Sequence, residues 1–192
     1  MNDDRLVDLL LEVATLKRMP RTGWLLRGVP HVESVADHSF GVTFVALALA
    51  DSLNGASGQG ASALDLEKVL IMAVLHDLAE VRLTDLPVPA MRLLAAEVKE
   101  TAEARALGEL LAVLPGKERF EALWKEFEDH DSPEGRLVRD ADKLEMMVQC
   151  LRYEQAGSRG LDEFWQAMDA QSWHYELSSE LYRRLKAKRS ET

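Results

Sequence analysis

Residues 69–80 read VLIMAVLHDLAE, an apolar run that ends in an adjacent histidine and aspartate, with a glutamate three residues later. Val69, Met72 and His76 recur at helical spacing, and Asp65 is placed to cap the helix that contains them. We therefore predict a buried helix that carries polar groups at its C-terminal end.

The His76-Asp77 pair and Glu80 form the first candidate site. Residues three and four apart are neighbours on a helix, so Glu80 is expected on the same side as both. A buried imidazole with two carboxylates is costly unless the groups are paired or bind a metal ion. The cluster therefore indicates a metal site or a catalytic site.

Another helix is predicted upstream of this run. Residues 34–37 (Ser-Val-Ala-Asp) have the form of a capping box and start a helix that runs to about Leu53. His38 stands at the head of its apolar face. Taken alone, this histidine is better explained by a bond to a core carbonyl group than by a metal ion.

A long helix follows Ser132-Pro133, a cap with proline in the first helical position, and is expected to end near Gln155. Asp142 falls on the apolar side of this helix, whereas Asp140 falls further round and is expected to be solvated. An aspartate in an apolar stripe needs a positive partner, and a metal ion is one such partner.

The rest of the chain predicts an all-α fold, because β-branched residues never form alternating runs. The length of 192 residues suits one domain, residues 1–192, of about seven or eight helices. The C-terminal helices at 161–188 either pack on the preceding part or form an interface. Further helices are expected at about 3–18, 90–113, 117–129, 161–169 and 173–188, with a Gly/Ser/Ala-rich connection at 54–63.

The charge pattern limits the possible partners. The formal net charge of −10 argues against binding to a nucleic acid polymer, which favours a basic surface. Residues 13–32 nevertheless contain no acidic residue but do contain Lys17, Arg18, Arg21 and Arg27. This stretch indicates either a site for a small anionic ligand or a solvated basic loop.

Cysteine content and hydropathy indicate the compartment. Cys150 is the single cysteine, so an internal disulfide is impossible. No apolar run approaches the ~18–20 residues that a membrane span needs, and the first residues lack a signal-peptide pattern. We expect a cytoplasmic protein without a membrane partner.

A histidine, a His-Asp pair and a distant aspartate, all on predicted helices, resemble the signature of the HD-domain superfamily. Local sequences narrow the resemblance to the HD-domain 5'-deoxynucleotidase family, over residues 5–155. These sequences are LKRMPRTGW (16–24), ESVADHS (33–39), HDLAE (76–80), TDLP (84–87) and ADKL (141–144).

The resemblance implies a helical HD-domain homodimer that hydrolyses deoxyribonucleoside 5'-monophosphates to deoxynucleosides and phosphate. It assigns Glu80 and Asp85 as the helper acids, with Asp85 also at the substrate, and Trp24 as the ring that packs on the sugar and disfavours a ribose 2'-hydroxyl. The metal ligands that it assigns are His38, His76, Asp77 and Asp142.

The same resemblance bears on the metal and the phosphate. Two imidazoles and two carboxylates suit one divalent transition metal ion (Co, Mn, Ni, Fe or Zn) better than Mg, which prefers oxygen ligands. Arg18 and Arg21 are the candidate phosphate contacts. One bacterial branch has an arginine directly before the tryptophan, where this chain has Gly23, so Arg21 is favoured.

Two other functions stay open. The chain could be an HD phosphohydrolase that acts on another nucleotide or phosphomonoester, or a non-catalytic, metal-containing protein that senses nucleotides. Glu80 and Asp85 speak against the second, because a purely structural metal site does not need them. Trp24 could also be only a packing residue.

Overall fold

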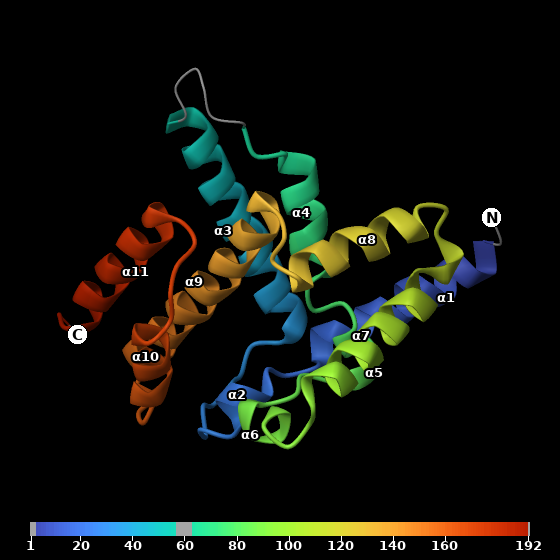
Figure 1. The fold of residues 1–192 in the computed structure, drawn as a ribbon. Helices are drawn as coiled ribbons and strands as arrows, with labels where there is room; N and C mark the ends of the chain where they lie inside the picture. Colours follow the sequence, from blue (N-terminus) through green and yellow to red (C-terminus); the bar gives the residue numbers. More distant parts are fainter. Residues whose placement is uncertain (1–2, 57–62, 192) are drawn as a thin grey trace.

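The computed structural model describes residues 3–56 and 63–191. This part of the chain is helical, with one isolated β-bridge between Pro20 and Ser34 and no strand. Eight of its α-helices have eight or more residues, which confirms the expected all-α fold (Figure 1). The elements are α1 (Asp3–Val13), η1 (Ala14–Arg18), α2 (Thr22–Leu25), α3 (Val35–Ala56), α4 (Leu66–Leu75), α5 (Glu80–Leu83), α6 (Val88–Met91), α7 (Ala96–Leu110), η2 (Leu111–Val113), α8 (Lys117–Glu128), α9 (Pro133–Gln155), α10 (Asp162–Asp169) and α11 (Glu176–Arg189).

Helices α3, α4 and α9 form the frame of the molecule. α3 packs against both α4 and α9, while α4 also contacts α8 (Figure 1). Each frame helix begins where its capping residue predicts. The Asp37 amide donates to Ser34 Oγ at 3.1 Å, Asp65 Oδ1 accepts from the Lys68 amide, and Ser132 Oγ accepts from the Gly135 amide. These caps satisfy amide groups that would otherwise lack partners at the helix starts.

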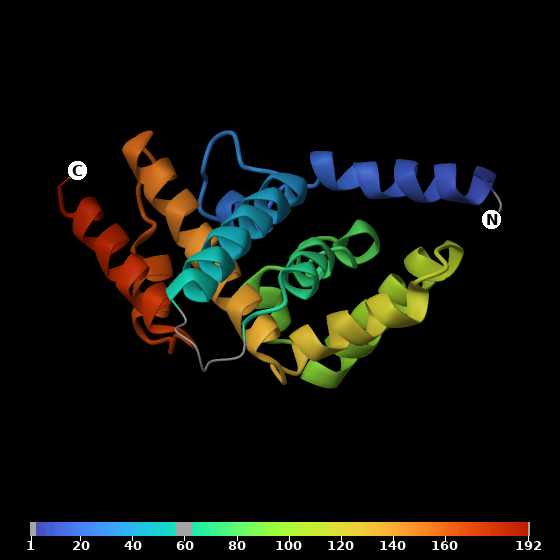
Figure 2. The same ribbon diagram turned by 90° about the horizontal axis from the view of Figure 1, so that it is seen from above.

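Two groups of buried apolar side chains hold the helices together. The main core lies between α3, α4 and α9 and includes Met72 and Met147, which are fully buried. The second core lies under α1, η1, α7 and η2. In Figure 2, α1 and α11 lie at opposite ends of the molecule, so the two cores occupy different parts of it.

The C-terminal helices pack on the preceding part of the chain. Trp165 of α10 and Tyr182 of α11 belong to the main core, and α11 packs along α9. Trp165 is 1% exposed. Within this chain, residues 161–188 therefore pack on the preceding part, while an interface formed by them stays a prediction.

α3 is long and apolar enough to cross a membrane by length and composition alone, with a mean hydropathy of 1.2. The expectation that no apolar run reaches such a length was therefore wrong. A single helix of this kind is weak evidence of a membrane span, and α3 also packs against α4 and α9, although only 22% of the apolar window is buried.

Two predicted helices are divided. The helix expected at 3–18 becomes α1 and a 3-10 turn, where Thr15 Oγ1 donates to the Glu12 carbonyl at 2.7 Å and competes with regular helix hydrogen bonding. The helix expected at 90–113 becomes α6, α7 and η2. Leu93, between α6 and α7, is 87% exposed, so no burial holds that segment in one helix.

Two further expectations concern single positions. Asp140 is fully buried rather than solvated, because its carboxylate accepts hydrogen bonds from the His174 and Tyr175 amides before α11. The predicted connection at 54–63 lies mostly outside the described residues, although Asn54 to Ala56 still belong to α3.

Candidate active site

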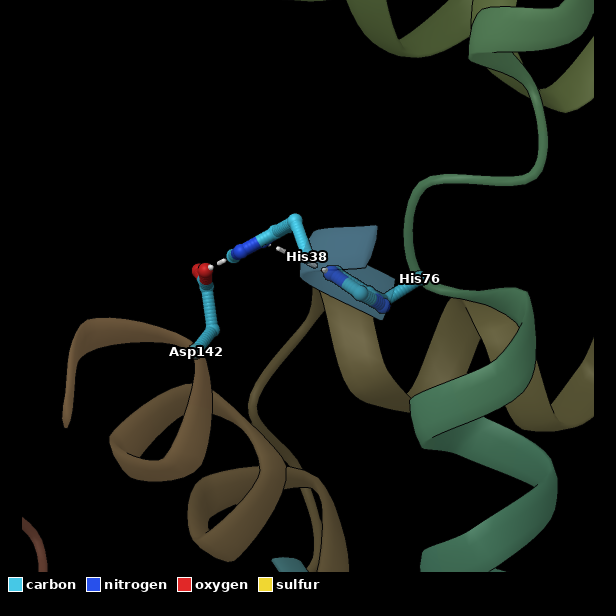
Figure 3. A group of neighbouring side chains, drawn as sticks. All are labelled: His38, His76 and Asp142. Atoms are coloured by element: carbon cyan, nitrogen blue, oxygen red, sulfur yellow. Dashed lines mark hydrogen bonds and ion pairs between the residues drawn. The ribbon is translucent and has the colours of Figure 1, made fainter. Parts of the chain in front are cut away.

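The four predicted metal ligands come together at the meeting point of α3, α4 and α9. Figure 3 shows that His38, His76 and Asp142 point toward one another. The two histidine Nε2 atoms lie 3.5 Å apart, and Asp142 Oδ1 lies 3.2 Å from His38 Nε2. Asp77 Oδ2 lies 3.2 Å from His76 Nε2 and 3.5 Å from His38 Nε2.

The hydrogen bonds behind the histidines decide which atoms face the cluster. His76 Nδ1 lies 2.8 Å from the Ala73 carbonyl, and His38 Nδ1 lies 2.5 Å from Glu145 Oε2. Both oxygens accept hydrogen bonds, so each Nδ1 is the donor and the neutral rings turn their Nε2 lone pairs toward each other. Such an arrangement is repulsive unless a cation or a proton lies between them.

The spacing of the donor atoms also fits a metal ion. With metal–nitrogen distances of about 2.1 Å, ligand atoms lie roughly 3.0 Å apart at octahedral angles and about 3.4 Å apart at tetrahedral angles. The contacts here are 3.2–3.5 Å. The residues therefore fit a divalent cation at the centre of the cluster.

The electrostatics of the cluster favour positive charge. Burial lowers the pKa of His38, but hydrogen bonds with Asp142 and Glu145 outweigh it and raise that pKa to about 10. Burial acts to raise the pKa of Asp77, but His76 and Arg21 hold it well below its usual range. The site thus retains a proton where a metal ion would otherwise lie.

The chain bends at the His-Asp pair. α4 ends at Leu75, and residues 76–79 form a turn before α5 begins at Glu80. The expectation of one continuous helix through Glu80 was wrong. The Glu80 amide donates to the Asp77 carbonyl at 3.1 Å and closes this turn. The side chains of Asp77 and Glu80 therefore still reach the same cavity.

A cavity of about 310 Å³ opens beside the cluster. Asp77 and Asp142 line it, which places two predicted metal ligands at its wall. Its other polar lining residues are Arg21, Glu80, Thr84, Asp85, Lys99 and Glu103, and its apolar lining residues include Trp24, Leu86, Pro87, Val88, Met91, Met146 and Phe164.

Arg21 is the residue of the basic stretch that reaches this cavity. Its Nη1 lies 3.2 Å from Asp77 Oδ2 and 4.0 Å from Asp85 Oδ1. Burial lowers the pKa of Arg21, but the charges of Asp77, Asp142 and Asp85 raise it above its usual range. The guanidinium group is therefore a permanent positive charge at the cavity wall.

The other basic residues point elsewhere. Arg18 is exposed at the end of η1 and is not among the residues that line the cavity. Leu16 is buried in the second core, so Lys17 and Arg18 face outward. Arg27 is engaged in an ion pair with Glu163. The structure therefore separates Arg18 from the predicted substrate site.

Glu80 has an unusual environment. Its Oε2 is buried and has no hydrogen-bond partner in the described part of the chain. Burial raises its pKa to about 9, and the negative charges of Asp77 and Asp85 act in the same direction. Glu80 is therefore a carboxyl group at the cavity that keeps a proton near neutral pH when no metal ion is present.

Asp85, in contrast, is held in place by its neighbours. Its Oδ2 accepts hydrogen bonds from both the amide and the Oγ1 of Thr22. Thr84, just before it, has φ of 64°, a left-handed conformation that is strained for a β-branched residue by roughly 1–3 kcal/mol. The two hydrogen bonds from Thr22 thus hold this carboxylate at the cavity.

Trp24 serves as a packing residue and also lines the cavity. It is 2% exposed, and its ring lies 4.3 Å from that of Phe164 and 5.4 Å from that of Tyr153, between centroids. Its Nε1 donates to Glu33 Oε1 at 2.8 Å. The two interpretations of this residue are therefore compatible.

Sequence reasoning missed four polar residues at or behind the site: Glu33, Lys99, Glu103 and Glu145. Glu145 follows Asp142 by three residues on α9, a spacing that could have indicated it. Lys99 and Glu103 come from α7 and form an i,i+4 ion pair at 2.8 Å. No local signal relates that pair to the cavity, because only tertiary packing brings α7 there.

Comparisons with known proteins agree with this geometry. A profile described as HD domain matches residues 13–177. The chain is similar to 5'-deoxynucleotidase HDDC2 of Danio rerio, with 35% identity over 179 residues, 91% of this chain and 83% of that protein. Similarity to 5'-deoxynucleotidase HDDC2 of Homo sapiens extends over 190 residues at 32% identity, 96% of this chain and 86% of that protein.

Similarity also extends to solved structures. A structure described as a conserved hypothetical protein from Pyrococcus furiosus superimposes with a TM-score of 0.79 and 41% sequence identity. The match covers 94% of this chain and 99% of that one. The helical arrangement around the site is therefore shared over nearly the full length of both chains.

Proposed function

Since the chain belongs to the HD domain family, we propose that it is a metal-dependent 5'-deoxynucleotidase, which hydrolyses deoxyribonucleoside 5'-monophosphates to deoxynucleosides and phosphate. One observation carries this proposal. The four converging donor atoms lie beside a cavity whose wall also holds a permanent cation, Arg21, and a buried carboxyl group without a partner, Glu80. A metal-dependent phosphomonoesterase can use all three, since the metal ion and the cation neutralise phosphoryl charge and the carboxyl group can transfer a proton. The 5'-deoxynucleotidases to which the chain is similar support the choice of substrate.

The metal site is proposed to hold one divalent transition metal ion on His38, His76, Asp77 and Asp142. A bound ion lowers the pKa of a coordinated water and neutralises negative charge on a phosphoryl group. Two imidazole ligands favour Co, Mn, Ni, Fe or Zn over Mg.

Arg21 is proposed to bind the phosphate. Its planar guanidinium group can donate two parallel hydrogen bonds to phosphate oxygens. It is already held at the wall beside Asp77, so little side-chain freedom remains to be lost on binding. The outward position of Arg18 gives it no such contact.

Glu80 and Asp85 are proposed to have different roles. Glu80 Oε2 has no partner in the described residues and is free to exchange a proton with water or with the departing 5'-oxygen. Asp85 is engaged by Thr22 and lies 4.0 Å from Arg21 Nη1. We infer that Glu80 moves the proton and that Asp85 orients Arg21 and the substrate.

Trp24 is proposed to contact the sugar. The ring is fixed by Phe164, Tyr153 and Glu33, so it forms a rigid apolar wall. A ribose 2'-hydroxyl against such a wall would lose its hydrogen bonds to water without replacement. Deoxyribonucleotides are therefore the expected substrates.

Phosphate release from a panel of monophosphates tests the proposal. With added Co²⁺ or Mn²⁺, deoxyribonucleoside 5'-monophosphates should be hydrolysed faster than the matching ribonucleotides. Equal rates would contradict the role given to Trp24. Release only from unrelated phosphate esters, or nucleotide binding without turnover under any divalent ion, would contradict the proposed function itself.

We also propose that the protein is a homodimer. Large apolar side chains are exposed on neighbouring elements, among them Leu10 on α1, Phe40 and Phe44 on α3, and Val74 on α4. Phe40 is 75% exposed, and such patches are typical of protein interfaces. Light scattering with size-exclusion chromatography should give a dimer mass, and Phe40→Asp should shift it toward the monomer. The cytoplasmic location stays a prediction.

A further inference from the structure

The metal ligand His38 is held from behind by a carboxylate that the proposed mechanism does not use. Glu145 Oε2 lies 2.5 Å from His38 Nδ1, on the side of the ring opposite to the metal cluster. His38 is fully buried and Glu145 is 8% exposed, so water cannot replace this contact. The contact fixes both the orientation of the ring and the atom that faces the metal ion.

Helix geometry makes Glu145 a specific partner. Glu145 follows the ligand Asp142 by three residues on α9, and therefore lies on the same face of that helix. α9 thus supplies one metal ligand directly and orients a second ligand that belongs to α3. The relative position of α3 and α9 therefore affects the metal site through the contact between Glu145 and His38.

Gly41 provides the space that Glu145 needs. A Cβ atom at Gly41 would lie 2.6 Å from Glu145 Oε1 and 2.7 Å from its Cγ. Gly41 follows His38 by three residues on α3, so it lies beside the ring that Glu145 contacts. Any larger residue there must displace the carboxylate.

A second, partly buried carboxylate extends this contact toward the substrate. Carboxylate oxygens of Glu33 and Glu145 and a ring nitrogen of His38 all lie within 4.8 Å of one another. Glu33 also accepts the hydrogen bond from Trp24 Nε1, and its carbonyl accepts from the Arg21 amide at 3.0 Å. The Glu33 side chain therefore contacts Trp24, whereas its contact with Arg21 is made by main-chain atoms.

We propose that Glu145 is the positioning residue for His38 and that the side chain of Glu33 positions Trp24, so that one network of carboxylates joins the metal site to the wall of the cavity. The part that concerns Trp24 rests on the proposed function. The part that concerns His38 rests on the metal-site geometry alone, and it holds whatever the substrate is.

Titration of Co²⁺ into the metal-free, full-length protein tests the role of Glu145. Glu145→Gln keeps the shape of the side chain but removes the charge, and should raise the Kd for Co²⁺ roughly 10- to 100-fold. Gly41→Ala should raise it as well, although alanine favours the helix more than glycine does. Both variants should keep the helical circular dichroism of the parent.

A matched control separates positioning from a general loss of stability. Glu154 is another partly buried glutamate of α9, and it is paired with Arg189 far from the site. Glu154→Gln should lower the melting temperature but leave the Kd for Co²⁺ within about twofold, because it lacks any contact with a metal ligand. If Glu145→Gln and Gly41→Ala both bind Co²⁺ with the parental Kd, the role given to Glu145 is wrong.

The role of Glu33 is tested on the loaded protein. Glu33→Ala should raise KM for a deoxynucleotide about tenfold and leave the Kd for Co²⁺ nearly unchanged, while Glu33→Gln, which keeps an acceptor for Trp24, should be much closer to the parent. The Kd of inorganic phosphate, read from the Co²⁺ absorption spectrum, should stay near the parental value, because the main-chain contact between Glu33 and Arg21 survives the substitution. A parental KM in Glu33→Ala would overturn this part. Absence of turnover in the parent would instead contradict the proposed function, while the Co²⁺ titration would still decide the role of Glu145.

Discussion

The metal cluster and the substrate wall are built in different ways. The metal donors lie on or directly after the long helices α3, α4 and α9, whose buried faces form the main core. Much of the cavity wall comes from α2, α5 and α6, which have four residues each, and from the loops beside them, with further side chains from α7, α9 and α10. Single side-chain contacts, such as the one between Thr22 and Asp85, hold the wall together.

This difference separates two properties of the site. The position of the metal ion depends on the packing of whole helices, which is costly to change because interiors are close-packed. The shape of the wall depends on short turns that tolerate substitution. Changes in the frame should therefore abolish chemistry, whereas changes in the wall should alter substrate binding and leave the metal ion in place.

The largest effect is expected for His76→Ala in the frame. Loss of the metal ion removes several kcal/mol of transition-state stabilisation, so activity should fall about a thousandfold or more. The metal-free fold should persist, because outside the cluster the His76 ring makes one hydrogen bond in the described part of the chain, to the Ala73 carbonyl. Elemental analysis, phosphate release and circular dichroism test this, and full activity in the variant would show that the metal site is wrong.

Glu80→Gln tests the proposed proton transfer at a residue that lies between the metal cluster and the cavity wall. If Glu80 transfers a proton, kcat should fall roughly 10²- to 10⁴-fold while the metal content stays unchanged. Near pH 9 the metal-free variant should be at least as stable as the parent, because a buried charge without a partner has been removed. Glu118→Gln, on the exposed side of α8, is the control. A parental kcat in Glu80→Gln would contradict the role in proton transfer.

The stability of the metal-free protein should also depend on pH. The pKa of His38 is about 10 in the folded protein and near 6.5 in the unfolded chain, so the stability from its proton is fully present below pH 6.5 and is lost as pH rises toward 10. The raised pKa of Glu80 acts in the same direction, as pH rises from about 4.5 to about 9. The melting temperature of the metal-free protein should therefore fall between pH 7 and pH 9.5.

The affinity for the metal ion should instead increase as pH rises. A metal ion must displace the His38 proton, so the Kd for Co²⁺ should fall about tenfold per pH unit over the same range. Differential scanning fluorimetry in EDTA and calorimetric titration measure the two trends. A melting temperature that rises with pH in the metal-free protein would contradict the assignment.

The smallest effect is expected in the wall. Arg21→Lys loses the two-pronged contact with phosphate and should raise KM about tenfold, with unchanged metal content. Arg18→Ala should stay within about twofold of the parent, because Arg18 faces away from the cavity. A larger effect for Arg18 than for Arg21 would reverse the assignment of the phosphate contact.

Much of the frame could be predicted because its signals are local. Ser34, Asp65 and Ser132 cap the helices that carry the site, and apolar spacing shows which faces are buried. His38, His76, Asp77 and Asp142 stand out as polar residues on or beside those buried faces. Boundaries were less accurate where side chains compete with the backbone, as at Thr15, or where burial is lacking, as at Leu93.

By itself, the sequence determined that the chain is helical and that His38, His76 and Asp142 interrupt its apolar faces, because capping and apolar periodicity act within a few residues along the chain. Only the tertiary structure decided that Arg21 rather than Arg18 reaches the cavity, that α7 brings Lys99 to its wall, and that Glu145 lies behind His38. These contacts join residues from different elements. They depend on how the elements pack against one another, which no local pattern in the sequence specifies.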